Sequence, residues 1–151
     1  MANTACISLA LQMSLIEELR RRFFKRRTPY VVPSLFYIVY CATGCRNIFI
    51  PDRHLDYLDD RTFKDIFAKF IKASVDVTLP FYDCDDRARS LWNFVRNDGI
   101  FSMKKNLAFG MLWTERHALC LYVTPEPSVR FVEPANGRLT GIYSRVRFVI
   151  F

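Results

Sequence analysis

Three residue types that together support nucleophilic catalysis follow one another in this sequence: a cysteine, a histidine and a glutamate. Cys84 lies among aspartates, His117 opens an apolar run, and Glu133 closes the next apolar run. A thiol attacks an electrophilic carbon once a base has taken its proton, and an imidazole oriented by a carboxylate is such a base. The order of these residues therefore predicts a nucleophile, a general base and a carboxylate that fixes the base.

The candidate nucleophile stands at a predicted helix start. Asp83 is a favourable N-cap residue, and Asp86 supplies the acidic half of a capping box. The positive end of the helix dipole favours a thiolate in the first turn. Apolar residues follow Cys84 at helical spacing, so a small core cysteine is a second interpretation of the same position. These apolar residues are Ala88, Leu91, Trp92 and Val95.

The aspartates around Cys84 form a second candidate site. Asp83, Asp85 and Asp86 place their carboxylates within one short segment. Their negative charge raises the pKa of a neighbouring thiol and opposes the helix dipole, whereas a bound cation would reverse the effect. Carboxylate oxygens are ligands that calcium prefers. The three residues are therefore candidate calcium ligands, and a helix cap with first-turn acids is the alternative explanation.

A predicted hairpin brings the histidine and the glutamate together. If the two apolar runs pair as antiparallel strands, Val123 lies opposite Val129. The same register places Leu119 opposite Glu133, with His117 as a diagonal neighbour of that glutamate. Neither side chain is usual on a strand that faces a core. We therefore expect the pair to meet at one end of the sheet.

The first half of the sequence predicts mainly helices. An amphipathic helix is expected over about residues 4–25, and a second begins at Asp59 or Asp60 with Phe63, Ile66, Phe67, Phe70 and Ile71 on its apolar face. A third runs from Asp83 to about Arg96, where Asn97-Asp98-Gly99 ends it. Residues 31–40 are rich in β-branched and aromatic residues, and Pro33 makes them an edge strand or an extended segment.

The second half predicts strands. Four apolar runs separated by turn residues cover about residues 107–113, 117–123, 129–133 and 143–151. Helices followed by strands indicate an α+β fold class, with N-terminal helices packed on a C-terminal antiparallel β-sheet meander.

Length and composition predict one domain. The 151 residues are 51% hydrophobic, which is enough for a dense core. Within residues 1–151, residues 1–50 supply a helix and an extended segment of unknown role, and residues 56–151 form the core. The five cysteines are odd in number and lack metal-ligand spacing. We therefore expect reduced cysteines in a reducing, intracellular compartment.

The net charge of +7 is concentrated in one block near the N-terminus. Such a block binds nucleic acid or an anionic surface, or it is a solvated basic helix end. It comprises Arg20, Arg21, Arg22, Lys25, Arg26 and Arg27. These charges follow the first apolar segment, so no signal peptide is expected. The apolar run at residues 30–42 is too short to span a membrane.

Three separated segments carry a family resemblance. They are Asp83-Cys84-Asp85-Asp86-Arg87-Ala88, His117-Ala118-Leu119 and Phe131-Val132-Glu133-Pro134. Together they resemble the domain related to the C-terminal part of a mushroom agglutinin, over about residues 56–151. The resemblance implies a papain-like fold, calcium-dependent cysteine peptidase activity and a catalytic triad of Cys84, His117 and Glu133. Related short domains look common among tailed-bacteriophage proteins.

Two residues depart from the family pattern. Arg87 stands where members often carry an aromatic residue, and Ala135 stands where they often carry a glutamine. Without that glutamine amide, one hydrogen bond to the substrate or to the developing oxyanion is lost. Where the amide is an oxyanion donor, its loss lowers the reaction rate by about 10²-fold or more. The pattern therefore supports the fold more strongly than the activity.

The sequence is compatible with two functions. One is a cysteine hydrolase, specifically a peptidase acting on a protein or peptide. The other is an inactive bacteriophage structural protein, or a protein that binds a host partner, with the fold retained. By the resemblance, either would be found in the bacterial cytoplasm during infection or in the virion.

Overall fold

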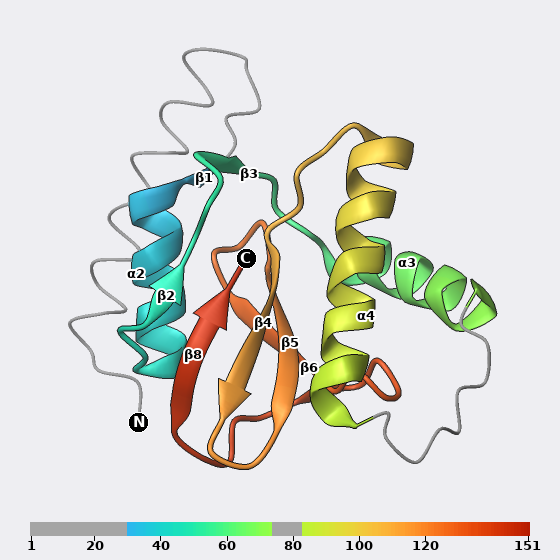
Figure 1. The fold of residues 1–151 in the computed structure, drawn as a ribbon. Coiled ribbons are helices and arrows are strands. Elements are labelled where there is room, and N and C mark those ends of the chain that lie inside the picture. Colours follow the sequence, from blue (N-terminus) through green and yellow to red (C-terminus); the bar gives the residue numbers. More distant parts are fainter. Residues whose placement is uncertain (1–29, 74–82) are drawn as a thin grey trace, which may run out of the picture.

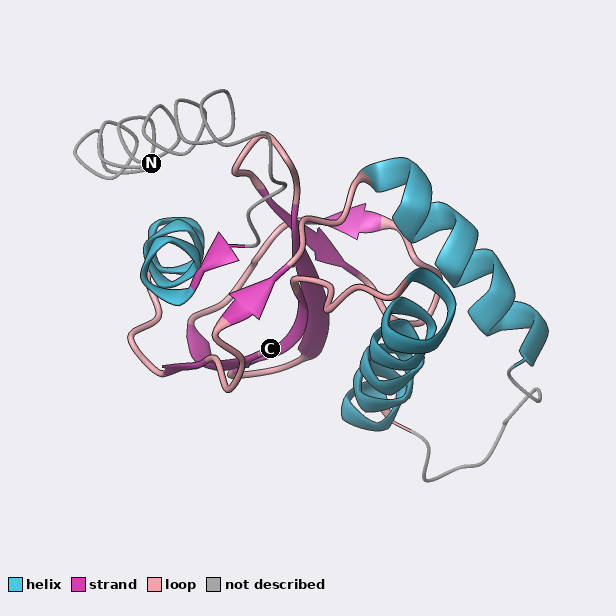
Figure 2. Ribbon diagram, turned by 90° about the horizontal axis from the view of Figure 1, so that it is seen from above, coloured by secondary structure: helices cyan, strands magenta, loops and turns pink. Residues whose placement is uncertain are grey.

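The sheet of this protein lies between helices on both of its faces. A computed structural model describes residues 30–73 and 83–151. Helix α2 covers one face, and helices α3 and α4 lie on the other (Figures 1 and 2). The helices are α2 (Val32–Thr43), α3 (Asp60–Ala73) and α4 (Cys84–Asn97), and a π-helix, η1 (Asp98–Met103), continues α4.

The central sheet is mixed, with the strand order β2-β8-β4-β5-β6-β7. Its strands are β2 (Ile48–Phe49), β4 (Phe109–Thr114), β5 (Ala118–Val123), β6 (Val129–Val132), β7 (Leu139–Thr140) and β8 (Val146–Ile150). A small antiparallel sheet joins β1 (Tyr30–Val31) to β3 (His54–Leu55).

The α+β class is confirmed, but the sheet is not a simple antiparallel meander. Strands β4 to β7 do form a meander, whereas β8 returns to the other side of β4. Strand β2 then pairs with β8 in the parallel direction. Helix α2 precedes both other helices and lies on the opposite face, so the helices do not form one layer on the sheet.

Alternating residues of the sheet separate the core into two clusters. On the α2 side, Leu112, Leu121 and Val149 pack with Leu35 and Val39. On the side of α3 and α4, the cluster combines sheet residues with residues of both helices: Phe63, Ile66, Ala88, Leu91, Val95, Phe109, Met111, Cys120 and Tyr122. The period-2 pattern of the strands therefore determines which helix each residue faces.

Helix α3 matches its predicted start and apolar face. Asp59 caps it, because its carboxylate accepts hydrogen bonds from the Thr62 backbone N–H and hydroxyl, each at 2.8 Å. These bonds lower the pKa of the Asp59 carboxyl. Phe63, Ile66 and Phe70 are buried as expected, whereas Ile71 at the end of the helix is exposed.

The prediction of an edge strand or an extended segment around Pro33 is wrong, because the chain forms helix α2 there. The backbone N–H groups of a first helical turn have no carbonyl partner within the helix. Pro33 stands in that turn, so its missing N–H costs no hydrogen bond and does not break the helix. Leu35, Ile38 and Val39 recur at helical spacing and are buried against the sheet. Packing of this face overrides the β propensity of the segment.

Helix α4 ends at Asn97, close to its predicted end at about Arg96. Asp98 and Gly99 do not stop the helical path as expected, because they begin η1, and the chain turns only at Lys104, which has a left-handed φ of 56°. Asp98 stabilises this continuation, because its carboxylate accepts hydrogen bonds from Ser102 at 2.8 Å and from Lys69 at 3.1 Å.

Several sequence predictions fall outside the described residues. They are the helix over about residues 4–25 and the basic block between Arg20 and Arg27. Within the described ranges, no helix combines the length and the apolar character needed to cross a membrane.

Candidate functional site

His117 and Glu133 meet at one end of the sheet. Strands β5 and β6 pair with Val123 opposite Val129 and Cys120 opposite Val132, which confirms the predicted register. His117 immediately precedes β5, and Glu133 immediately follows β6. His117 Nε2 lies 2.8 Å from Glu133 Oε2, the length of a short hydrogen bond or ion pair.

The carboxylate of Glu133 is held from both sides. Its second oxygen, Oε1, accepts a hydrogen bond from the Ala135 backbone N–H at 3.3 Å. The Glu133 backbone carbonyl accepts one from the Gly137 N–H at 2.8 Å. In the tautomer in which Nε2–H of His117 donates to this carboxylate, Nδ1 of the ring retains the lone pair and is the basic nitrogen of the pair.

Cys84 begins α4, half-buried, with its side chain against the cluster on the α4 face. Ala88 lies one turn further along, and its carbonyl accepts a hydrogen bond from the Cys120 thiol at 3.5 Å. This contact aligns the first half of α4 with β5. Figure 1 shows the first turn of α4 at the same end of the sheet as the β4–β5 turn and the end of β6. The fold thus brings Cys84, His117 and Glu133 to one end of the molecule.

The thiol and the imidazole do not form a hydrogen bond with each other in the described part of the chain. Catalytic hydrogen bonds are often long in the absence of substrate and shorten when it binds. Both side chains have access to solvent, because His117 is 39% exposed and Cys84 is half-buried. The site therefore holds a formed base–carboxylate pair and a separate thiol.

The aspartates beside the thiol act first as a helix cap. Asp83 accepts hydrogen bonds from the backbone N–H groups of Asp85 at 3.2 Å and Asp86 at 3.4 Å. The side-chain hydrogen bond between Asp83 and Asp85 lowers the pKa of Asp83 and raises that of Asp85. Asp86 does not complete a capping box; its carboxylate lies 3.1 Å from a guanidinium nitrogen of Arg89.

The same aspartates form a carboxylate cluster that fits a cation only in part. One oxygen each from Asp83, Asp85 and Asp86 lies within 4.8 Å of the others. Calcium takes six to eight oxygens, so water or a further group would have to complete the shell. Arg89 already pairs with Asp85 at 3.2 Å and with Asp86 at 3.1 Å. Calcium would therefore compete with this guanidinium, a partner that the spacing of three and four residues could have predicted.

The other cysteines differ from Cys84. Cys120 is fully buried, and desolvation together with the nearby Glu133 charge raises the pKa of its thiol. Cys45 is also buried and free. Cys41 is disulfide-bonded, which the expectation of a wholly reduced chain did not include. Among the free thiols of the described ranges, Cys84 alone is accessible to solvent.

No family model matches this chain, and neither does any curated protein. Solved structures do resemble it. One is described as the PSL1a–E64 complex, with a TM-score of 0.68 and 17% identity over 82% of this chain and 51% of that chain. Another is the lectin of Polyporus squamosus bound to a human-type influenza-binding epitope, with a TM-score of 0.62 and 18% identity over 78% of this chain and 47% of that chain.

This chain shares its fold with a mushroom lectin. At this level of identity the likeness shows the fold alone, and the chain spans about half the length of the structures it resembles. The mushroom-agglutinin part of the sequence resemblance is thereby supported.

The same comparison corrects the expected classification. The sequence predicted a papain-like cysteine peptidase, and hence a hydrolase, from a bacteriophage. That classification is wrong here, because the neighbours are described as a lectin and not as peptidases. The bacteriophage and virion setting gains no support from them.

Proposed function

We propose that this chain carries a nucleophilic cysteine site for acyl transfer, with Cys84 as nucleophile, His117 as general base and Glu133 as the residue that orients His117. The observation that carries the proposal is the 2.8 Å contact between His117 Nε2 and Glu133 Oε2. That contact leaves Nδ1 as the basic atom at the end of the sheet where α4 presents its first-turn thiol.

In the proposed step, Nδ1 of His117 takes the thiol proton as the Cys84 sulfur bonds to the carbonyl carbon of an acyl donor. The bond from that carbon to the leaving group then breaks, and the imidazolium returns the proton to the leaving group. The acyl group remains on sulfur as a thioester until an acceptor nucleophile removes it. Glu133 stabilises the imidazolium that forms in between.

A neighbour's ligand supports thiol chemistry in this fold. The PSL1a structure is described as a complex with E64. E64 carries an epoxide, an electrophile whose ring opens when a thiolate attacks it. E64 is therefore a suitable probe for this chain as well.

The test is the rate at which E64 and iodoacetamide modify each cysteine of the folded chain at pH 7, followed by mass spectrometry of peptides. We expect Cys84 to react first. Replacing His117→Gln should slow its modification by at least about 10-fold, because a thiol without a base is only a few per cent ionised at pH 7. Cys84 reacting no faster in the parent chain than in the His117→Gln variant would overturn the proposal.

A non-catalytic binding protein with this fold is the second candidate. The observation that favours it is that the described residues include no hydrogen bond between the Cys84 thiol and His117. On this alternative the chain binds a protein partner, or a glycan as the Polyporus lectin does. The labelling rates separate the two candidates, because only the first requires His117 to accelerate the reaction of Cys84.

A further inference from the structure

On the side where Cys84 lies, no helix of the described ranges, residues 30–73 and 83–151, covers the part of the sheet formed by β8 and β2. Helix α4 packs on β4 and β5, and α3 packs beside it through Phe63. Neither helix packs on β8 or β2 to a comparable extent. The side chains of Phe148 on β8 and Phe49 on β2 are accordingly 38% and 54% exposed. This uncovered part of the face is apolar but open to solvent.

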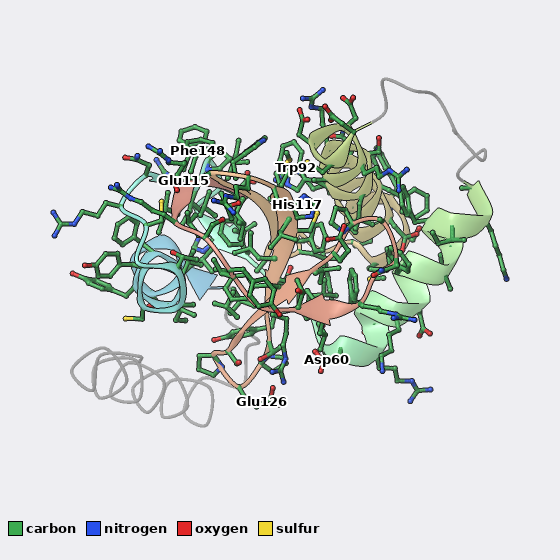
Figure 3. All side chains as sticks on the ribbon, turned by 90° about the horizontal axis from the view of Figure 1, so that it is seen from below. Asp60, Trp92, Glu115, His117, Glu126 and Phe148 are labelled. Carbon is green, nitrogen blue, oxygen red and sulfur yellow. The ribbon has the colours of Figure 1, made fainter. Side chains whose placement is uncertain are left out.

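An aromatic pair links this uncovered part to the candidate site. The rings of Trp113 and Phe148 lie 5.7 Å apart, on directly paired residues of β4 and β8. Trp113 also pairs across to Ala118, the residue after His117. Trp113 and Ala118 both belong to the cluster against which Cys84 packs. The pair therefore continues the surface of the candidate site along the same face of the sheet, and Figure 3 shows Phe148, His117 and Trp92 on this side of the molecule.

The span of this surface matches a short stretch of polypeptide. Phe148 lies two strands from β5, which is about 10 Å at the usual spacing of strands. An extended chain advances about 3.3 Å per residue. A side chain seated on the Trp113–Phe148 pair would therefore belong to a residue about three positions from a group held beside His117.

The rim of the aromatic pair is basic. The β4–β5 turn and the start of β8 carry three exposed arginines, namely Arg116, Arg145 and Arg147. Arg147 pairs with Glu115 at 2.8 Å. Within the described ranges, Arg116 and Arg145 form no ion pair. Positive charge thus remains beside the apolar surface, and it complements a ligand that carries acidic groups.

We propose that the Trp113–Phe148 pair is a docking subsite for a polypeptide that carries a large apolar side chain next to acidic residues. The subsite deepens the acyl-transfer function, on which it rests for the identity of the substrate. Burial of an aromatic or large aliphatic side chain on the two rings supplies affinity. Arg116 and Arg145 select acidic flanking residues.

The test is peptide binding to the full chain with Cys84→Ala, which cannot react. The probe is the fluorescein-labelled peptide Gly-Glu-Phe-Glu-Gly-Gly, followed by fluorescence anisotropy. Comparison peptides carry Ser in place of Phe, or Lys in place of Glu. We expect the Glu/Phe peptide to bind at least about 10-fold more tightly than either comparison peptide, the loss expected when one anchoring contact is removed.

Variants locate the binding surface. Phe148→Ala should weaken binding of the Glu/Phe peptide about 10-fold. Phe148→Trp keeps an aromatic surface and guards against misfolding, and its affinity for the peptide should stay within about 2-fold of the parent value. Phe101→Ala is the matched control, because Phe101 is 71% exposed on η1, away from the pair. The double substitution Arg116→Glu and Arg145→Glu should weaken binding of the Glu/Phe peptide and reduce the dependence of that binding on salt.

The outcomes separate the subsite from the proposed function. Peptide binding in a chain whose Cys84 proves unreactive would support the subsite and overturn the acyl-transfer site. Rapid, His117-dependent labelling of Cys84 without peptide binding would overturn the subsite alone. Equal effects of Phe148→Ala and Phe101→Ala, or binding of a sialylated trisaccharide in place of the peptide, would also overturn it.

Discussion

Glu133 fixes the imidazole of His117 because each of its carboxylate oxygens has a different partner. Oε2 contacts His117 Nε2 at 2.8 Å, while Oε1 accepts from Ala135 N–H at 3.3 Å. A glutamine has the same shape, but it lacks the charge that stabilises an imidazolium. The effect of Glu133 on reactivity can therefore be separated from its effect on the fold.

We expect Glu133→Gln to lower the rate of Cys84 modification by E64 by about 10-fold or more, with little change in Tm. Thermal melts of both proteins provide the control for folding. An unchanged rate in a well-folded Glu133→Gln variant would show that the carboxylate has no part in activating the thiol.

Two substitutions of Asp83 separate the effect of its helix cap from the effect of its charge at the start of α4. Asp83→Ala removes the acceptor of two backbone N–H groups and should lower the free energy of unfolding. Asp83→Asn keeps an equally good cap and should leave stability nearly unchanged. Denaturant unfolding measures both changes. Equal losses in the two variants would mean that the charge of Asp83, not its cap, stabilises the helix.

The same residues allow a test of calcium. Arg89 pairs with Asp85 and Asp86, so Arg89→Gln should free both carboxylates for a cation. We expect calcium to raise the Tm of Arg89→Gln by more than that of the parent chain, since binding to the folded state alone stabilises it. Addition of a chelator should reverse the shift. No shift in either protein would remove these aspartates as a calcium site.

At the scale of the elements, the sequence predicted those features that depend on residues close together in the chain. The cap at Asp83 and the β5–β6 register follow from residues close in sequence, and the structure contains both. Helix α2 was missed because Leu35, Ile38 and Val39 are helical only through their contact with a distant sheet. The Trp113–Phe148 pair was missed for a similar reason, since it depends on β8 returning beside β4.

The β6–β7 turn is an element whose geometry depends on one glycine. Gly137 has a φ of +68°, and a Cβ there would lie 2.5 Å from the Phe67 ring. Gly137→Ala should therefore combine backbone strain with a clash on α3, and it should disturb the adjacent Glu133. Gly44→Ala is the matched control, because Gly44 has a φ of +67° with no atom within 4 Å of such a Cβ.

We expect Gly44→Ala to cost about 1 kcal/mol from backbone strain and Gly137→Ala to cost clearly more. Denaturant unfolding gives both values, and E64 labelling reports whether the site is disturbed. Equal losses of stability would mean that the Phe67 ring moves aside freely, and that the turn does not depend on this packing.

At the scale of the whole molecule, two buried groups couple stability to alkaline pH. Desolvation raises the pKa of both Cys120 and Tyr122, and for Tyr122 the hydrogen bond to Asp60 at 2.7 Å adds to the effect. In the unfolded chain these groups ionise at about pH 8.5 and 10. The unfolded state therefore loses protons first as the pH rises, and alkaline solution favours unfolding.

The neutral thiol and phenol stabilise the fold fully below the unfolded pKa values, and this stabilisation falls as the pH rises above them. For Cys120 the loss between about pH 8.5 and 10 amounts to roughly 2 kcal/mol. Denaturant unfolding from pH 7 to 10 measures this slope, and Cys120→Ala should flatten it whatever its stability at pH 7. An equally steep slope in that variant would show that the Cys120 thiol is not what limits alkaline stability. Since Cys120 donates to the Ala88 carbonyl, its ionisation would also loosen α4, and the first turn that holds Cys84, from the sheet.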